Sequence, residues 1–230
     1  MRIKTIALAA AAAVSAASAP AIAAPTFNVA VPAGSVEEVP STRPAFMDNN
    51  NFHAQLAGLG YTHESIGAGV TVVEGGIVTF EFLGSESGYA DFMKLGGALG
   101  VTVFSENTLY SDYFGGGAPT ASFSVGAGVL DIFFGNAQGL GRTANGAGGS
   151  GGFAVFLPSA GTGSFSSNVI YFGYDDDNLQ NPDDNHDDMI IRATISAVPE
   201  ASTWAMMIAG FAAVGMTVRR RSQNARVSFS

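Results

Sequence analysis

Residues 77–83 have the sequence Ile-Val-Thr-Phe-Glu-Phe-Leu, and this segment decides the fold class. Its side chains alternate in character, with Val78, Phe80 and Phe82 on one face and Thr79 and Glu81 on the other. Because successive side chains of a β-strand point to opposite faces, this period of two predicts a half-buried strand.

Similar short runs of β-branched and aromatic residues follow along the chain, separated by Gly, Asn, Asp and Ser. They are Val70–Val73, Val101–Phe104, Ala121–Val125, Val129–Phe134, Phe153–Leu157, Val169–Tyr174 and Met189–Ser196. Helix is expected only as a turn or two near residues 52–59 or 90–95. The pattern predicts an all-β domain, a β-sandwich or jelly roll, over residues 48–197.

The N-terminus has the features of a secretory signal peptide over residues 1–24. Arg2 and Lys4 precede an uncharged apolar stretch, and Ala21-Ile22-Ala23 supplies the small residues that signal peptidase requires. Residues 25–47 contain four prolines and few large apolar residues, which indicates an extended lead-in to the domain.

The C-terminus holds a second apolar segment, Trp204–Val218, followed by Arg219, Arg220 and Arg221. Counted from Ala201 the segment is about 27 Å long at ~1.5 Å per residue, which predicts a single transmembrane helix. The arginines orient the tail, residues 222–230, toward the cytoplasm, so the β-domain is expected outside the inner membrane.

Residues 198–221 resemble the PEP-CTERM sorting signal of Gram-negative bacteria that make exopolysaccharide. The resemblance rests on Val198, Pro199, Glu200, Trp204, the apolar run and the arginine cluster. It implies recognition and cleavage by exosortase, a membrane protease, and release to the cell surface or extracellular matrix. This chain has Ala201 where the family usually has Pro, and nine residues follow the basic cluster where the family usually ends.

Charge and cysteine content limit what the exported segment can bind. Residues 25–197 contain 18 Asp and Glu against four Arg and Lys, a net charge of −14, which argues against nucleic acid as a partner. The chain has no cysteine, so no disulfide stabilises it after export.

Seven carboxylates gather within residues 175–188, between two predicted strands. Calcium takes six to eight oxygen ligands from flexible loops, so we expect calcium here, on Asp175, Asp177, Asp183, Asp184, Asp187 and Asp188. The alternative is a solvated acidic loop, because the spacing does not match an EF-hand. Arg192 is the nearest basic residue.

Enzyme motifs are weaker. Glu81, Glu86 and Asp131 are candidate glycosidase carboxylates. Gly148–Gly152 fits the G-x-S-x-G pattern but lacks the helix that should follow. A zinc site would have to assemble His53, His63 and His186 from distant parts of the chain.

Residues 70–197 also resemble a β-rich domain of unknown function found in bacterial surface proteins, through residues 80–86, 129–134 and 184–191. The resemblance implies a structural or binding role without catalysis. We therefore expect a non-enzymatic surface or exopolysaccharide-matrix protein, with a polysaccharide-active enzyme or a calcium-dependent lectin-like module as alternatives.

Overall fold

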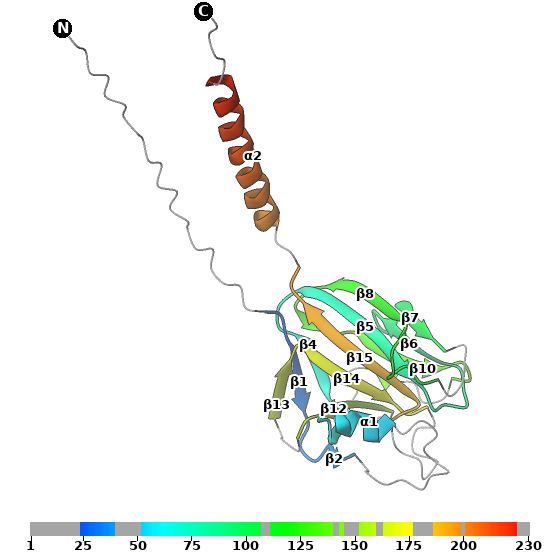
Figure 1. Cartoon of the computed structure of the whole chain (residues 1–230). Coiled ribbons are helices and arrows are strands. Elements are labelled where there is room, and N and C mark those ends of the chain that lie inside the picture. The colour runs from blue at the N-terminus through cyan, green and yellow to red at the C-terminus, as the bar shows by residue number, and fades with distance from the viewer. Residues whose placement is uncertain are drawn as a thin grey trace, which may run out of the picture.

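A computed structural model describes residues 24–39, 52–106, 111–139, 143–144, 152–159, 163–176, 186–198 and 201–224. These residues form three antiparallel sheets and two helices, which confirms the all-β class of the domain (Figure 1).

The largest sheet has seven strands in the order β2-β3-β12-β14-β15-β5-β8. Their bounds are Val36–Glu38, His63–Ile66, Phe153–Leu157, Val169–Tyr174, Met189–Ser196, Gly76–Gly84 and Thr120–Val125, respectively. The segment with alternating side chains is its strand β5. Val78 and Phe80 of β5 are fully buried, as the period of two predicts.

Two smaller sheets have four strands each. One has the order β13-β1-β4-β9, with bounds Gly163–Ser167, Phe27–Val31, Gly69–Val72 and Gly128–Val129. The other has the order β11-β10-β6-β7, with bounds Thr143–Ala144, Ile132–Asn136, Asp91–Leu95 and Val101–Ser105. We call the second one the β6–β10 sheet.

One hydrophobic core joins the three sheets. The inward side chains of β5, β12, β14 and β15 pack with those of β1 and β4 and with Met93, Ile132 and Phe134 of the β6–β10 sheet. One face of the seven-stranded sheet therefore lies against both smaller sheets.

The opposite face of the seven-stranded sheet is partly covered by helix α1, Phe52–Gly58. Phe52 and Leu56 of α1 pack with Phe156, Tyr171 and Ile190. Because β12 is covered on both faces, all five of its residues are buried, and its sequence is a continuous apolar run rather than an alternating one.

Several predicted runs are strands with nearly the predicted bounds, among them β12, β14 and β15. The run at 129–134 is divided between β9 and β10. The prediction of a helical turn at 90–95 is wrong, because Asp91–Leu95 forms strand β6, which pairs with β10 and β7.

Residues 25–47 are predicted from the sequence to be a lead-in, but this segment contributes strand β1. β1 lies between β13 and β4, and its inward residues Phe27 and Val29 are fully buried. The domain therefore begins at β1. Alternation in Phe-Asn-Val-Ala-Val was a signal of this strand, hidden by the prolines on either side.

The C-terminal segment forms helix α2, Ala201–Asn224, which extends away from the sheets (Figure 1). Among the residues that the structure describes, no helix combines the length and apolar character needed to cross a membrane, so the predicted span is not found there. The predicted signal peptide lies outside the described residues, apart from Ala24.

Candidate metal centre

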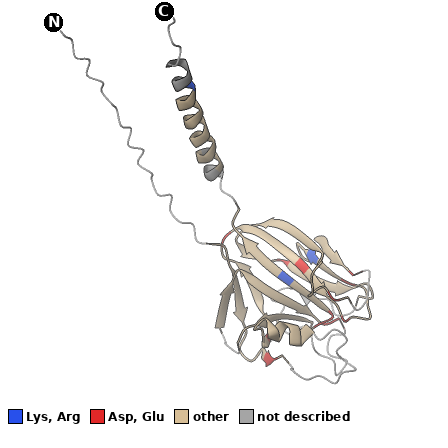
Figure 2. Ribbon diagram, in the orientation of Figure 1, with Lys and Arg blue, Asp and Glu red and all other residues tan. Residues whose placement is uncertain are grey.

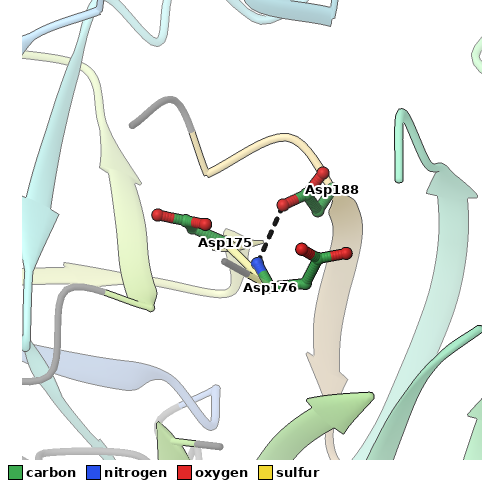
Figure 3. A group of neighbouring side chains, drawn as sticks. All are labelled: Asp175, Asp176 and Asp188. Carbon is green, nitrogen blue, oxygen red and sulfur yellow. Dashed lines mark hydrogen bonds between the residues drawn. The ribbon is translucent and has the colours of Figure 1, made fainter. Parts of the chain in front are cut away.

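Three carboxylates converge where β14 ends and β15 begins. Each of Asp175, Asp176 and Asp188 offers an oxygen, and these oxygens lie within 4.8 Å of one another (Figure 3). The two strands are antiparallel neighbours, so the residues that follow β14 and the residues that precede β15 lie together at the same end of these strands. We call these three residues the aspartate group.

Hydrogen bonds fix the aspartate group to the body of the domain. The Asp176 amide donates to the Asp188 carboxylate at 2.8 Å, and the Ser87 hydroxyl donates to the Asp176 carboxylate. The side-chain amide of Asn136 donates to the Asp176 carbonyl at 3.2 Å. Asp175 and Asp176 are almost completely buried. Two members of the group therefore belong to the folded interior, and Asp188 is half-buried beside them.

Only some of the six predicted calcium ligands lie in the aspartate group. Asp175 and Asp188 belong to the aspartate group, together with Asp176, which the predicted ligand set omits. Asp187 lies outside the group, with its carboxylate 3.9 Å from Nδ1 of His53. Asp177, Asp183 and Asp184 lie outside the described residues.

Two of the three histidines are buried beside acidic side chains. Besides the His53–Asp187 contact, Nδ1 of His186 lies 3.3 Å from a carboxylate oxygen of Glu64. His63, on β3, contacts the Thr62 hydroxyl instead. The described acidic groups that could hold a metal do not include these histidines, so the zinc alternative gains no support.

The β6–β10 sheet brings two further buried carboxylates, Asp91 and Glu106, which the sequence prediction missed. Asp91 begins β6 and is fully buried, and Glu106 directly follows β7 and is 5% exposed. β6 and β7 are antiparallel, and the Glu106 amide donates to the Asp91 carbonyl at 2.8 Å. Asp91 shares the inward face of β6 with Met93, a period-two signal that the helix prediction at 90–95 concealed.

Both carboxyls have raised pKa values. Burial, followed by the charges of Asp176 and Asp188, raises the pKa of Asp91 to about 9, and the Ser87 hydroxyl offsets part of this effect. Burial raises the pKa of Glu106 to about 7, and the charge of Asp176 raises it further. The Ser85 side chain lowers this pKa and offsets part of the increase. The Ser87 and Ser85 hydroxyls lie near these carboxyls, but among the described residues no donor meets the full distance and angle criteria for a hydrogen bond to any of the four oxygens.

Tyr174 lies near carboxylates of both acidic sets. Its ring stacks on Phe134 with centroids 5.4 Å apart, and its hydroxyl is buried with no hydrogen-bond partner within the described part of the chain. Burial and then the charges of Asp91, Asp176 and Asp188 raise its pKa. The phenol therefore stays protonated.

Arg192, the base nearest to the acidic run in sequence, is committed elsewhere. It lies on the outer face of the seven-stranded sheet and binds the Glu81 carboxylate through two hydrogen bonds. Figure 2 shows how sparse the basic residues are over the sheets.

The candidate glycosidase carboxylates have different surroundings. Both carboxylate oxygens of Glu81 accept hydrogen bonds from Arg192, so the carboxylate is already engaged in an ion pair. Glu86 is buried, and Asp131 is exposed. Ser150 of the G-x-S-x-G pattern lies outside the described residues.

A groove of about 540 Å³ lies beside the Glu81–Arg192 pair, with Gln55, Tyr113, Phe114 and Tyr171 in its walls. Rings and paired charges together could contact both the faces and the hydroxyls of a sugar.

The chain matches no protein-family model, and no curated protein matches it at a significant level. The geometry of the buried carboxylates is therefore the main basis for a function.

The aspartate group also lies far from the C-terminal helix α2. β15 is eight residues long, which is about 26 Å at ~3.3 Å per residue, and it separates Asp188 from the exit of the chain toward α2 (Figure 1). Any ion bound here would stabilise the distal end of the domain.

Proposed function

We propose that this chain is an exported, non-enzymatic β-sandwich protein of the cell surface or exopolysaccharide matrix, stabilised by calcium at the distal end of its domain. The observation that carries the proposal is the convergence of the half-buried Asp188 with the buried Asp175 and Asp176.

Calcium suits this group because every donor is an oxygen. Calcium binds oxygens at about 2.3–2.6 Å, so two ligands on opposite sides of one ion are separated by up to about 5 Å. The oxygens of the aspartate group, within 4.8 Å of one another, meet this condition. Zinc and copper sites usually include nitrogen or sulfur ligands.

Delivery to the surface is part of the proposal. Signal peptidase would remove residues 1–24, and an exosortase-type protease would recognise residues 198–221, including Pro199 and Glu200. Large apolar side chains lie exposed around α2, among them Met206, Ile208, Phe211 and Val214. Such a helix has no packing role in the sheets, which supports a role in recognition by a membrane protease.

A lectin-like binding module is the second candidate, favoured by the groove beside Glu81 and Arg192. An extracellular polysaccharide-active enzyme is less well supported, because both oxygens of the candidate carboxylate Glu81 are engaged by Arg192.

Thermal unfolding of the purified protein in calcium and in EGTA tests the calcium part. A ligand at a hundredfold excess over its Kd stabilises the fold by about 2.7 kcal/mol, which is roughly 5–10 °C for a domain of this size. The shift should disappear in the Asp176→Asn, Asp188→Asn double variant. An equal Tm in calcium and EGTA would rule out calcium stabilisation.

Delivery is tested by expressing the full chain in a Gram-negative host with and without its exosortase. We expect shortened protein in the medium only when exosortase is present. A chain with Pro199 and Glu200 replaced by alanine should remain with the cells.

A further inference from the structure

Strand β8 ends the seven-stranded sheet and has a neighbour on one side only. It pairs with β5, and no described strand follows it in the order of the sheet (Figure 1). It has six residues, about 20 Å at ~3.3 Å per residue, and its register with β5 runs without a shift. An edge of this kind presents a row of backbone groups to solvent.

The pairing with β5 shows which backbone groups of β8 point outward. Directly before β8, the Phe82 amide donates to the Pro119 carbonyl at 3.0 Å. Hydrogen-bonded positions alternate along an antiparallel pair, so every second residue from Ala121 onward bonds toward β5. The residues between them direct their N–H and C=O groups away from β5, and these are Thr120, Ser122 and Ser124. Within the described part of the chain no strand lies there to receive them.

The other described sheet edges are mostly protected against pairing. β2 has three residues, two of them glutamates, and β9 and β11 have two residues each. The register of β7 with β6 shifts between Met93 and Lys94. Short length, charge and bulges all keep an edge from pairing. β8 has none of these features. β13 lacks charge as well, but it is shorter, with Phe165 as its one large apolar side chain.

The side chains of β8 leave an apolar surface incomplete. Ala121, Phe123 and Val125 pack against the core but are only half-buried. The Phe123 ring lies 6.2 Å from the Phe80 ring between centroids, and its other side is at the open edge. A strand placed beside β8 would therefore cover these three side chains and satisfy the outward backbone groups together.

Charge favours a second copy of this chain as that strand. Residues 113–130 contain no Asp, Glu, Lys or Arg, whereas residues 25–197 carry a net charge of −14. Two such acidic domains repel each other least where an uncharged strip of one meets the same strip of the other. In a two-fold antiparallel arrangement each β8 supplies the donors and acceptors that the other lacks, and the apolar residues of both lie on the same face.

We propose that β8 is a self-association edge, through which two copies of this chain pair antiparallel about a two-fold axis and join their seven-stranded sheets into one. The inference goes beyond the proposed function and does not depend on calcium. We expect a weak dimer, because one pair of six-residue strands is small beside the roughly 800 Å² per partner of a standard interface.

Site-specific cross-linking tests the contact directly, because the chain has no cysteine of its own. The full chain is kept in EGTA and in a mild detergent that covers α2. Ser122→Cys, an exposed position at the centre of β8, should give a covalent dimer with a short bis-maleimide reagent. Ser164→Cys, an exposed serine of β13, is the matched control and should stay monomeric. Equal yields from the two variants, or no dimer from Ser122→Cys, would overturn the inference.

Sedimentation velocity from about 1 μM to about 1 mM measures the affinity under the same conditions. Ser124→Pro removes an outward N–H and leaves the bonds to β5 in place, as proline at a solvent-facing edge position does. Each dimer loses two hydrogen bonds, so the Kd should rise by about tenfold. An unchanged Kd in this variant would contradict the proposed pairing.

A lysine pair guards against a proline variant that merely misfolds. Ser124→Lys keeps the backbone intact and should also weaken the dimer, whereas Ser164→Lys in β13 should associate as the wild type does. An equal loss in both lysine variants would show head-to-tail pairing of β8 with β13 and overturn the two-fold arrangement. Wild-type association in Ser124→Lys would overturn the role of β8.

Discussion

Arg192 on β15 and Glu81 on β5 form a bidentate ion pair across neighbouring strands, with Nε 2.5 Å from Oε2 and Nη2 2.6 Å from Oε1. The two residues are directly paired in the register of the sheet. The guanidinium therefore fixes the Glu81 side chain on the outer face of the sheet. Arg192 pairs with Glu81 and not with the aspartate group.

Loss of this pair should have a modest effect. Arg192 is 37% exposed and Glu81 18%, so water screens part of the attraction. We expect Glu81→Gln to lower the free energy of unfolding by about 0.5–1.5 kcal/mol in urea titrations. Glu74→Gln, at an exposed position before β5, is the control and should change the stability very little. A loss above about 3 kcal/mol would show that the pair is effectively buried.

Strand β1 supplies the clearest test of where the domain begins. Phe27 is fully buried in the core, so Phe27→Ala should lower the free energy of unfolding by about 3–5 kcal/mol. Leu99→Ala, at a side chain that is 99% exposed, should have almost no effect. If residues 25–47 were only a lead-in, the two variants would unfold at the same urea concentration.

Gly173, near the end of β14, should not tolerate a side chain. A Cβ there would lie 2.3 Å from the His186 carbonyl oxygen and 2.8 Å from the Phe156 ring. Gly173→Ala must therefore displace the segment that leads to Asp187 and Asp188, at a cost of about 1–3 kcal/mol. Gly126→Ala has open space around its Cβ and serves as the control in the same thermal melts. Equal melting temperatures would contradict the close packing at Gly173.

The stability of the cation-free protein should fall as the pH rises. The pKa of Asp91 is raised from about 3.8 to about 9, and that of Glu106 from about 4.5 to about 7. At pH values between the unfolded and the folded pKa of each group, the folded state therefore binds more protons than the unfolded state. Stability is greatest below the unfolded pKa values and decreases as the pH rises through about 7 and then about 9.

Urea unfolding in EGTA across this pH range measures the effect. Each extra proton in the folded state contributes up to about 1.4 kcal/mol per pH unit. Asp91→Asn removes the group that titrates highest, so its stability should fall less between about pH 7 and pH 9. Parallel pH profiles for the variant and the wild type would show that Asp91 does not titrate as described.

Much of the fold was predictable because it depends on local pattern. Alternation in β5 and the bounds of β12, β14 and β15 follow from side-chain period and from the turn residues between runs. β6 was missed because Asp91 and Lys94 interrupt the apolar pattern of Asp-Phe-Met-Lys-Leu.

The candidate site was predictable only in part. The acidic run drew attention to Asp175 and Asp188, because many carboxylates in a short segment are conspicuous in any sequence. Nothing local indicated that Asp91 or Glu106 would lie near Asp176, because they are about 70–85 positions away along the chain and approach it only through the packing of two sheets.

The sequence by itself determined that the domain is β-rich, strongly acidic and free of disulfides, since these properties reside in composition and short-range period. The tertiary structure alone decided that β1 completes a sheet, that Arg192 pairs with Glu81, and that Asp91 and Glu106 are buried at the end of the β6–β10 sheet. The physical reason is that strand pairing and layer packing bring together residues whose separation along the chain carries no information about their distance in space.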